Sequence, residues 1–292
     1  MDVLTQILIT GLTLGSLYAL AAVGLSLIYG TLGMFNMAHG LFMTVGAYVA
    51  FSVANSVHIP MLLGILVAML AGALIGVLTH LFIIHFMLGT DGFATNVLVA
   101  TAGLGIVLQD ILLKIYGGYP YPQPLTVDGF LRIGGVTVTY QAIITFTVSL
   151  ILIFTVAWLL LKTRFGRAIR ATALNREAAM LMGVKADTVF LQVMALAGML
   201  AGVAGLMIST QATLSPQMGG DPLLKAFVIC VVAGLGNVWG AGVCAFALAL
   251  FEASIGYYVG VRFGFPTMLF IVILMLIWRP QGLFGREKVV RL

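Results

Sequence analysis

The chain has 292 residues, of which 62% are hydrophobic and 8% charged, with a formal net charge of +5 and a mean hydropathy of +1.16. A soluble domain carries about 25% charged residues, so this composition excludes one. The long apolar runs also exclude a β-barrel, whose strands alternate over about 10 residues. We predict an all-α fold, a polytopic helical bundle integral to the membrane, in one domain (1–292). The positive charge is attributed to cytoplasmic Lys and Arg rather than to a nucleic-acid partner.

The predicted spans begin in a stretch without Asp, Glu, Lys or Arg between Asp2 and Asp91. A helix crosses a bilayer with about 20 apolar residues, so this stretch holds three or four crossings. Breaks at Pro, Gly, Asn and charge clusters divide the chain. The spans are 3–32, 40–55, 61–84, 93–114, 141–161 and 188–210, then a block at 222–278 that Gly-rich turns interrupt at 234–242 and 256–264. We favour three short crossings in that block, some broken or tilted, which gives about eight or nine in all.

Small residues predict how these helices pack. Pairs of glycines four residues apart occur at Gly11/Gly15, Gly72/Gly76 and Gly198/Gly202. In lipid such faces let two helix backbones approach closely, because hydrophobicity no longer drives helices together. The pattern indicates a packed bundle and says nothing about a substrate.

The turn GMFNMAHG (33–40) places Asn36 and His39 between two uncharged spans. A broken helix at membrane depth is tolerated only where it lines a cavity or is buried in protein. Asn36 and His39 are therefore candidates for lining a translocation path. The alternative is a solvated turn in which Asn36 caps a helix. The other histidines show no metal-ligand spacing and are expected to pack or to lie at the interface, and no metal site is predicted: His58, His80 and His85.

Two polar segments fix the expected orientation. Segment 115–140 is rich in Pro, Gly and alternating β-branched residues and predicts an exposed loop with a short hairpin. Segment 162–187 holds six of the fourteen basic residues, and the C-terminal tail holds four more. Basic loops are retained in the cytoplasm. Segment 162–187 and the C-terminus are therefore expected to be cytoplasmic, and segment 115–140 and the N-terminus periplasmic.

Within segment 162–187 the residues fit two short amphipathic helices. Apolar positions recur at 168–172 and again at Ala178, Ala179, Leu181 and Met182, which leaves on the polar faces Arg167, Arg170, Arg176 and Glu177. Gly183 is placed to end the second helix in left-handed geometry. From the residues alone, a helical knob that enters a cleft and an interfacial helix on anionic lipid fit equally well.

A carboxylate lies inside the apolar run VCAFALALFEASIGYY, at Glu252. Such a group is costly in hydrocarbon and normally faces a bundle interior, a water path or a partner. It could pair with Lys225, guide substrate or contact another subunit. The alternative is a neutralised carboxyl near the interface. Lys225 and Asp110 are weaker candidates, because both are placed near span ends where they can reach the interface.

The stretch EAAMLMG (177–183) resembles the E-A-A-x-x-x-G core of the coupling loop of bacterial ABC importer permeases, although the Ile-x-Leu-Pro ending of that motif is missing. Four longer stretches resemble the branched-chain amino acid branch of those permeases, nearly from end to end: 11–40, 165–184, 231–242 and 279–287. The chain looks most like the first of the two permease subunits in that system. The loop HFMLGTDG departs from the family, which usually carries basic residues there.

The resemblance implies an ABC importer permease in the bacterial inner membrane. It would carry branched-chain or other hydrophobic amino acids, or a related small amide or carboxylate. The implied partners are a paralogous second permease, two ATPase subunits and a periplasmic substrate-binding protein. The resemblance assigns ATPase coupling to Gly166, Arg167, Arg170, Asn175, Glu177, Ala178, Ala179 and Gly183.

No nucleotide site is predicted in the chain itself. It contains no GxxxxGK[ST], and its turn GLGNVWG lacks the Lys and Ser or Thr that bind phosphate and Mg²⁺. ATP and Mg²⁺ would therefore be bound by the partner ATPases, with no cofactor in this chain. A secondary transporter is the alternative, but it commonly needs several midplane carboxylates, and Glu252 is the one good candidate. An intramembrane enzyme is disfavoured, because neither HExxH nor GxSxG occurs and no catalytic residue is predicted.

Overall fold

The computed structural model describes residues 2–133 and 135–285. Eight helical segments among these residues are long and apolar enough to cross a membrane. The long helices are α1 (Asp2–Leu32), α2 (His39–Val57), α3 (Met61–Thr79), α5 (Phe93–Tyr116), α6 (Tyr140–Lys162), α9 (Ala186–Gln211), α11 (Val238–Tyr258) and α12 (Gly264–Trp278). The predicted all-α membrane bundle is thereby confirmed. Of the basic tail, Arg279 is described, whereas Arg286, Lys288 and Arg291 lie outside the described residues.

Shorter elements complete or connect these helices. A π-helix, η1 (His80–Ile84), and α4 (His85–Met87) extend α3 without a break. A short 3₁₀ turn, η2 (Val261–Phe263), leads into α12. The remaining elements are β1 (Phe130–Ile133), β2 (Val136–Thr139), α7 (Arg164–Leu174), α8 (Arg176–Leu181) and α10 (Gly220–Ala233). Five of the six predicted spans before residue 211 coincide with a single helix to within about three residues, and the span 61–84 does so with α3 together with its extension through η1 and α4.

Three short crossings are predicted for the block at 222–278, which holds the helices α10, α11 and α12. Two segments of the block, Val238–Tyr258 and Val261–Trp278, are long and apolar enough to cross a membrane, whereas α10 is too short. Helix α10 has 14 residues and so rises about 21 Å, less than the roughly 30 Å of a hydrocarbon core. The first break is narrower than the predicted turn at 234–242, because Asn237 caps α11 through the N–H of Gly240 and residues from 238 onward are helical. Gly234 and Gly236 take positive φ in this turn.

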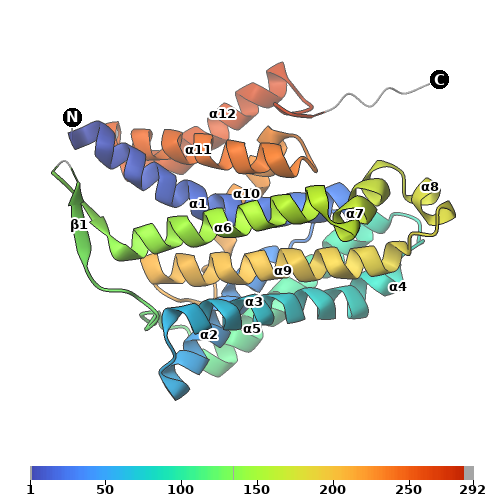
Figure 1. The fold of residues 1–292 in the computed structure, drawn as a ribbon, viewed down its shortest axis with the longest axis horizontal. Coiled ribbons are helices and arrows are strands. Elements are labelled where there is room, and N and C mark those ends of the chain that lie inside the picture. Colours follow the sequence, from blue (N-terminus) through green and yellow to red (C-terminus); the bar gives the residue numbers. More distant parts are fainter. Residues whose placement is uncertain (1, 134, 286–292) are drawn as a thin grey trace.

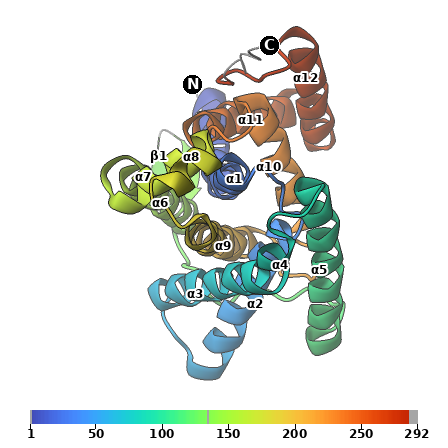
Figure 2. The same ribbon diagram turned by 90° about the vertical axis from the view of Figure 1, so that its right-hand side faces the viewer.

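Helices α1 and α9 form the centre of the bundle. In each of them, 72% of the most apolar membrane-spanning stretch is buried. Viewed end-on, α1 lies inside a ring of α11, α10, α6 and α9 (Figure 2). Helix α3 packs along α9, and its glycines meet those of α9 directly. A β-carbon at Gly72 would overlap the carbonyl oxygen of Gly198, and Gly76 meets the backbone of Met194 in the same way. The expected packing role of the glycine pairs is confirmed.

The two ends of the bundle differ (Figure 1). At one end, β1 and β2 form the antiparallel hairpin predicted within segment 115–140, with Phe130 opposite Thr139. The same loop is tied to the connection after α9 by an antiparallel bridge between Tyr121 and Leu214. The other end carries α7, α8 and α4. Loops 115–140 and 163–185 therefore lie at opposite ends.

Candidate functional site

The segment between α6 and α9 folds into the two short helices that the sequence predicts. Each begins at a side-chain cap: Thr163 Oγ1 accepts the N–H of Gly166, and Asn175 Oδ1 accepts the N–H of Ala178, both at 3.0 Å. Such caps supply acceptors for N–H groups that a helix start leaves unpaired. Gly183 follows α8 with φ of +85°. The predicted left-handed end of the second helix is thereby confirmed.

This helical knob, residues 163–185, is fixed to the bundle by inward contacts. Ile169 is buried, and Gly166 lies so close to the last turn of α6 that a β-carbon would overlap the carbonyl oxygen of Leu160. Arg170 donates to that same carbonyl. Arg176 corrects the sequence analysis, because it is half-buried with its guanidinium 5.1 Å from the ring centre of Phe190 in α9. A cation over an aromatic face is stabilised, so this arginine anchors α8 rather than standing on a polar face.

The tip of the knob is apolar and exposed. Leu174, Leu181 and Met182 have exposed fractions of 79%, 89% and 86%. Glu177 and Ala178 are exposed beside them, and Ala179 is buried. Of the four apolar positions predicted in the second helix, Ala179 alone packs inward, because a helix of 6 residues has room for few inward contacts. The sequence pattern does not mark Leu181 and Met182 as surface residues. Clustered exposed apolar side chains mark interaction sites.

The turn 33–40 lies inside the bundle. Asn36 and His39 are both fully buried, Asn36 Oδ1 accepts the N–H of Ala38 at 3.0 Å, and His39 Nε2 donates to the carbonyl of Ala21 at 3.2 Å. Ala21 lies about 16 Å before the end of α1, at 1.5 Å per residue. On the other side, the N–H of Met37 donates to Thr101 Oγ1 of α5 at 3.1 Å. The turn is therefore not the solvated turn of the alternative interpretation, although Asn36 does cap its own turn.

Two helix starts meet at this turn. A β-carbon at Gly40 of α2 would overlap the carbonyl oxygen of Gly219, and one at Gly219 would overlap that of Gly40. Neither α2 nor α10 has a side-chain cap at its first turn, so N–H groups and the positive end of each helix dipole point into this region. Asn36 Nδ2 and His39 Nδ1 are buried without a hydrogen-bond partner among the described residues. Asn36 Nδ2 can therefore donate a hydrogen bond to a polar group, whereas His39 Nδ1, in a ring whose Nε2 carries the proton, can accept one.

Lys225 and Glu252 form the ion pair that the sequence analysis had considered. Lys225 Nζ of α10 lies 2.7 Å from Glu252 Oε1 of α11 and donates to Tyr18 Oη of α1 at 2.5 Å. The two side chains are 17% and 14% exposed. Tyr18 is one turn of α1 away from Ala21, which accepts from His39. The predicted path residues on α2, α10 and α11 thus gather around one segment of α1.

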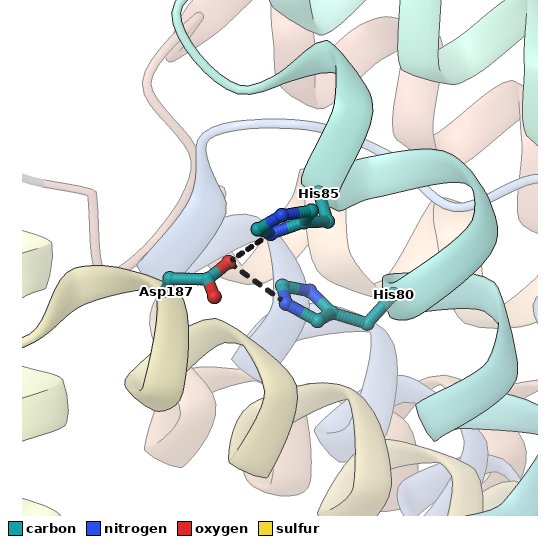
Figure 3. A network of polar contacts seen from close by, with 3 residues as sticks. All are labelled: His80, His85 and Asp187. Atoms are coloured by element: carbon teal, nitrogen blue, oxygen red, sulfur yellow. Dashed lines mark hydrogen bonds and ion pairs between the residues drawn. The ribbon is translucent and has the colours of Figure 1, made fainter.

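Asp110 does not join this group. It forms an exposed ion pair with Lys114 at 2.8 Å, one helical turn away on α5. A separate cluster had no signal in the sequence: His80, His85 and Asp187 converge beside the knob (Figure 3). The two histidines were expected to pack or to lie at the interface, and Asp187 had not been singled out.

The chain was compared with known proteins. A family model described as "Branched-chain amino acid transport system / permease component" matches residues 7–278. The high-affinity branched-chain amino acid transport system permease protein BraD of Pseudomonas aeruginosa is 28% identical, over 97% of this chain and 96% of its own. The corresponding protein LivH of Escherichia coli is 26% identical over the same shares. A probable LivH of Methanocaldococcus jannaschii is 28% identical, over 92% of this chain and 89% of its own. No solved structure matches.

Proposed function

Because this chain belongs to the branched-chain amino acid transport permease family, we propose that it is a permease subunit of an ABC importer that carries branched-chain or similar hydrophobic amino acids across the bacterial inner membrane. The observation that carries the proposal is the end-to-end match to BraD and LivH, which covers nearly all of both chains. Eight apolar spans within residues 2–133 and 135–285 agree with a multi-pass membrane protein.

The exposed apolar tip of the knob is the proposed contact with an ATPase. Leu174, Leu181 and Met182 present apolar side chains to water, and Glu177 offers a charge beside them. Helix α8 is held by Arg176 against Phe190 of α9. A force on the knob is therefore passed into the most buried pair of helices, α9 and α1. This arrangement supports coupling through contact rather than binding to lipid.

The translocation path is proposed to pass the segment of α1 around Tyr18 and Ala21. An amino acid carries one carboxylate and one ammonium group. The uncapped starts of α2 and α10 suit the carboxylate, as half-helix N-termini do in other transporters. Lys225 and Glu252 offer one charge of each sign close by. Because Lys225 neutralises Glu252, this carboxylate is a poor coupling site for an ion gradient, which disfavours a secondary transporter.

The partners follow from the same proposal. The ATP and Mg²⁺ sites belong to two separate ATPase subunits, a paralogous permease completes the path, and a periplasmic protein delivers the solute. The end bearing α7 and α8 is cytoplasmic, and the end bearing the hairpin is periplasmic. The basic residues of segment 162–187 support this orientation.

Purification of the tagged chain from its native membrane tests the proposal. We expect ATPase subunits to co-purify, and leucine-loaded binding protein to stimulate ATP hydrolysis by the reconstituted complex. Uptake of labelled leucine should require ATP and survive collapse of the proton gradient. Uptake that needs an ion gradient and no ATP would instead establish a secondary transporter.

A further inference from the structure

Three metal-ligating side chains meet at the end of the bundle that carries the knob. His80 Nε2 and His85 Nδ1 lie 3.0 Å and 3.1 Å from the same oxygen of Asp187, Oδ1. The three ligand atoms all lie within 4.8 Å of one another. In Figure 3 both imidazole rings point toward the carboxylate of Asp187, which belongs to the neighbouring helix. The cluster joins the extension of α3 to the second residue of α9.

The π-helix is what aligns the two histidines. Residues five apart in an α-helix differ by about 140° around the axis, at 3.6 residues per turn, so their side chains point apart. In η1 the N–H of His85 instead bonds to the carbonyl of His80, five residues back. This wider turn places the two rings one above the other, with centroids 6.3 Å apart. Single π turns inside α-helices are rare and occur frequently at functional sites.

We propose that His80, His85 and Asp187 bind a divalent transition-metal cation of the zinc class. Two imidazole nitrogens and one carboxylate oxygen are ligands that such cations take. In tetrahedral coordination, two ligands about 2.1 Å from a cation lie about 3.4 Å apart. The separations from Asp187 Oδ1 are 3.0 Å and 3.1 Å, so the ligand atoms must move apart by a few tenths of an ångström to admit the cation.

The exposure of the cluster and the charge of its carboxylate also fit a cation-binding site. His80 is fully buried, whereas the side chains of His85 and Asp187 are 52% and 49% exposed. A cation can therefore enter from the exposed side, where water completes its coordination. The carboxylate supplies a negative charge. A hard cation such as Mg²⁺ prefers an all-oxygen set and is not expected to compete.

Proton positions limit the affinity. Without metal, both rings donate an N–H to Asp187. A metal takes the lone pair of each coordinating nitrogen, so the proton of each neutral ring moves to the other nitrogen. For His80 that atom is Nδ1, which is buried and has no partner among the described residues. Metal-bound histidines usually donate this N–H to an acceptor. We therefore expect a reversible site that binds more weakly than a structural zinc site.

The test uses the full-length chain in detergent micelles, purified with a histidine-free tag and stripped of metal with a chelator. Co²⁺ is titrated while its visible absorption is recorded, and Zn²⁺ is measured by competition and calorimetry. We expect one cation per chain. His85→Gln and Asp187→Asn should each weaken binding at least about tenfold. His58→Asn is the matched control, because His58 is exposed between α2 and α3 and its φ of 52° suits asparagine.

The binding site does not rest on the proposed transport function, so the two can fail separately. Size-exclusion elution and helical circular dichroism confirm that each variant is folded. His85→Gln changes a half-exposed side chain and is expected to fold normally. If the native chain binds no Zn²⁺ or Co²⁺, or if folded His85→Gln and Asp187→Asn bind as the native chain does, the cluster is a hydrogen-bonded contact alone and the proposal is overturned.

Discussion

Gly72 of α3 and Gly198 of α9 lie backbone to backbone, so that a β-carbon added to either would overlap the carbonyl oxygen of the other. Gly72→Val or Gly198→Val should therefore separate α3 from α9. Overpacking a core position costs about 1–3 kcal/mol, and a contact between two backbones has no side chain that can yield. We expect a lower thermal midpoint in detergent and less monodisperse protein.

Gly103→Ala provides the control for the glycine contact. Gly103 lies in α5, and a β-carbon there would meet nothing within 4 Å. This variant should elute and unfold like the native chain. Equal behaviour of Gly198→Val and Gly103→Ala would show that the close approach of α3 and α9 does not contribute to stability.

The end of α8 should be essential for coupling. Gly183→Val forces a β-branched residue into φ of +85°, at a cost of about 1–3 kcal/mol, although its side chain would meet no neighbouring atoms. Leu181→Ser removes an exposed apolar side chain at the tip. We expect both variants to insert and assemble into the membrane bundle but to lose ATP hydrolysis stimulated by loaded binding protein, as measured in nanodiscs.

Two further variants separate ATPase contact from lipid contact. Leu181→Met keeps an apolar side chain and should retain stimulated hydrolysis. Arg167→Gln removes an exposed charge of α7 and should matter most if the knob lies on anionic lipid. Full stimulated hydrolysis in Gly183→Val, together with weakened vesicle binding in Arg167→Gln, would establish the lipid interpretation.

The pair Lys225–Glu252 should behave as a unit. Lys225→Met removes the charge partner of Glu252 at a largely buried position, and breaking a buried pair costs about 3–5 kcal/mol. The double variant Lys225→Met/Glu252→Gln removes both charges, so its stability should recover toward that of the native chain. If the pair lies on the path, leucine uptake remains lost in the double variant. Thermal unfolding of the native chain, Lys225→Met, Glu252→Gln and the double variant gives the coupling energy of the pair. Normal uptake in the double variant would remove the pair from the path.

Asn36 caps its own turn and is also a proposed path residue, and two substitutions can separate these roles. Because this side chain is fully buried, a bulky replacement would disturb packing and report on neither role. Asn36→Ser keeps an oxygen that can accept the N–H of Ala38, whereas Asn36→Ala loses it, at a cost of about 1 kcal/mol. A role in the path predicts that uptake falls in both variants while stability falls mainly in Asn36→Ala. Normal uptake in Asn36→Ser would leave the turn with a structural role.

Orientation can be read from cysteine labelling. Tyr119, in the loop at the hairpin end, is 82% exposed, and Ala173 lies exposed in the knob. We expect Tyr119→Cys to react with an impermeant maleimide added to intact cells, and Ala173→Cys only after the membrane is opened. The native cysteines, Cys230 and Cys244, are buried and give a low background. Reversed labelling would invert the assigned topology.

The sequence predicted the spans well because hydropathy and helix breakers report directly on crossing a bilayer. It also placed the αL end at Gly183 and the break between α10 and α11, since Gly marks both positions. It assigned Arg176 to a polar face, because periodicity describes one helix and Phe190 belongs to another. The exposed positions of Leu181 and Met182 were missed because a helix of 6 residues has room for few inward contacts, whatever its periodicity.

The cluster of His80, His85 and Asp187 shows a second limit of prediction from the sequence. Five-residue spacing argues against shared ligands in an α-helix, and no composition signal distinguishes a π turn from an α turn. Asp187 is more than one hundred residues further along the chain, so the third ligand depends on the packing of α9 beside the extension of α3. Tyr18 beside Lys225 is likewise a product of packing between distant helices.

The central position of α1 has a consequence for biosynthesis. This helix is made first, but its glycine face fits Phe246 and Leu250 of α11, which are translated more than two hundred residues later. At about 5–20 residues per second, α1 waits roughly 12–48 s for that partner. During the interval its small-residue face must be occupied by lipid or by the insertion machinery. The centre of the bundle is therefore among the last parts to close, even though it is the first to enter the membrane.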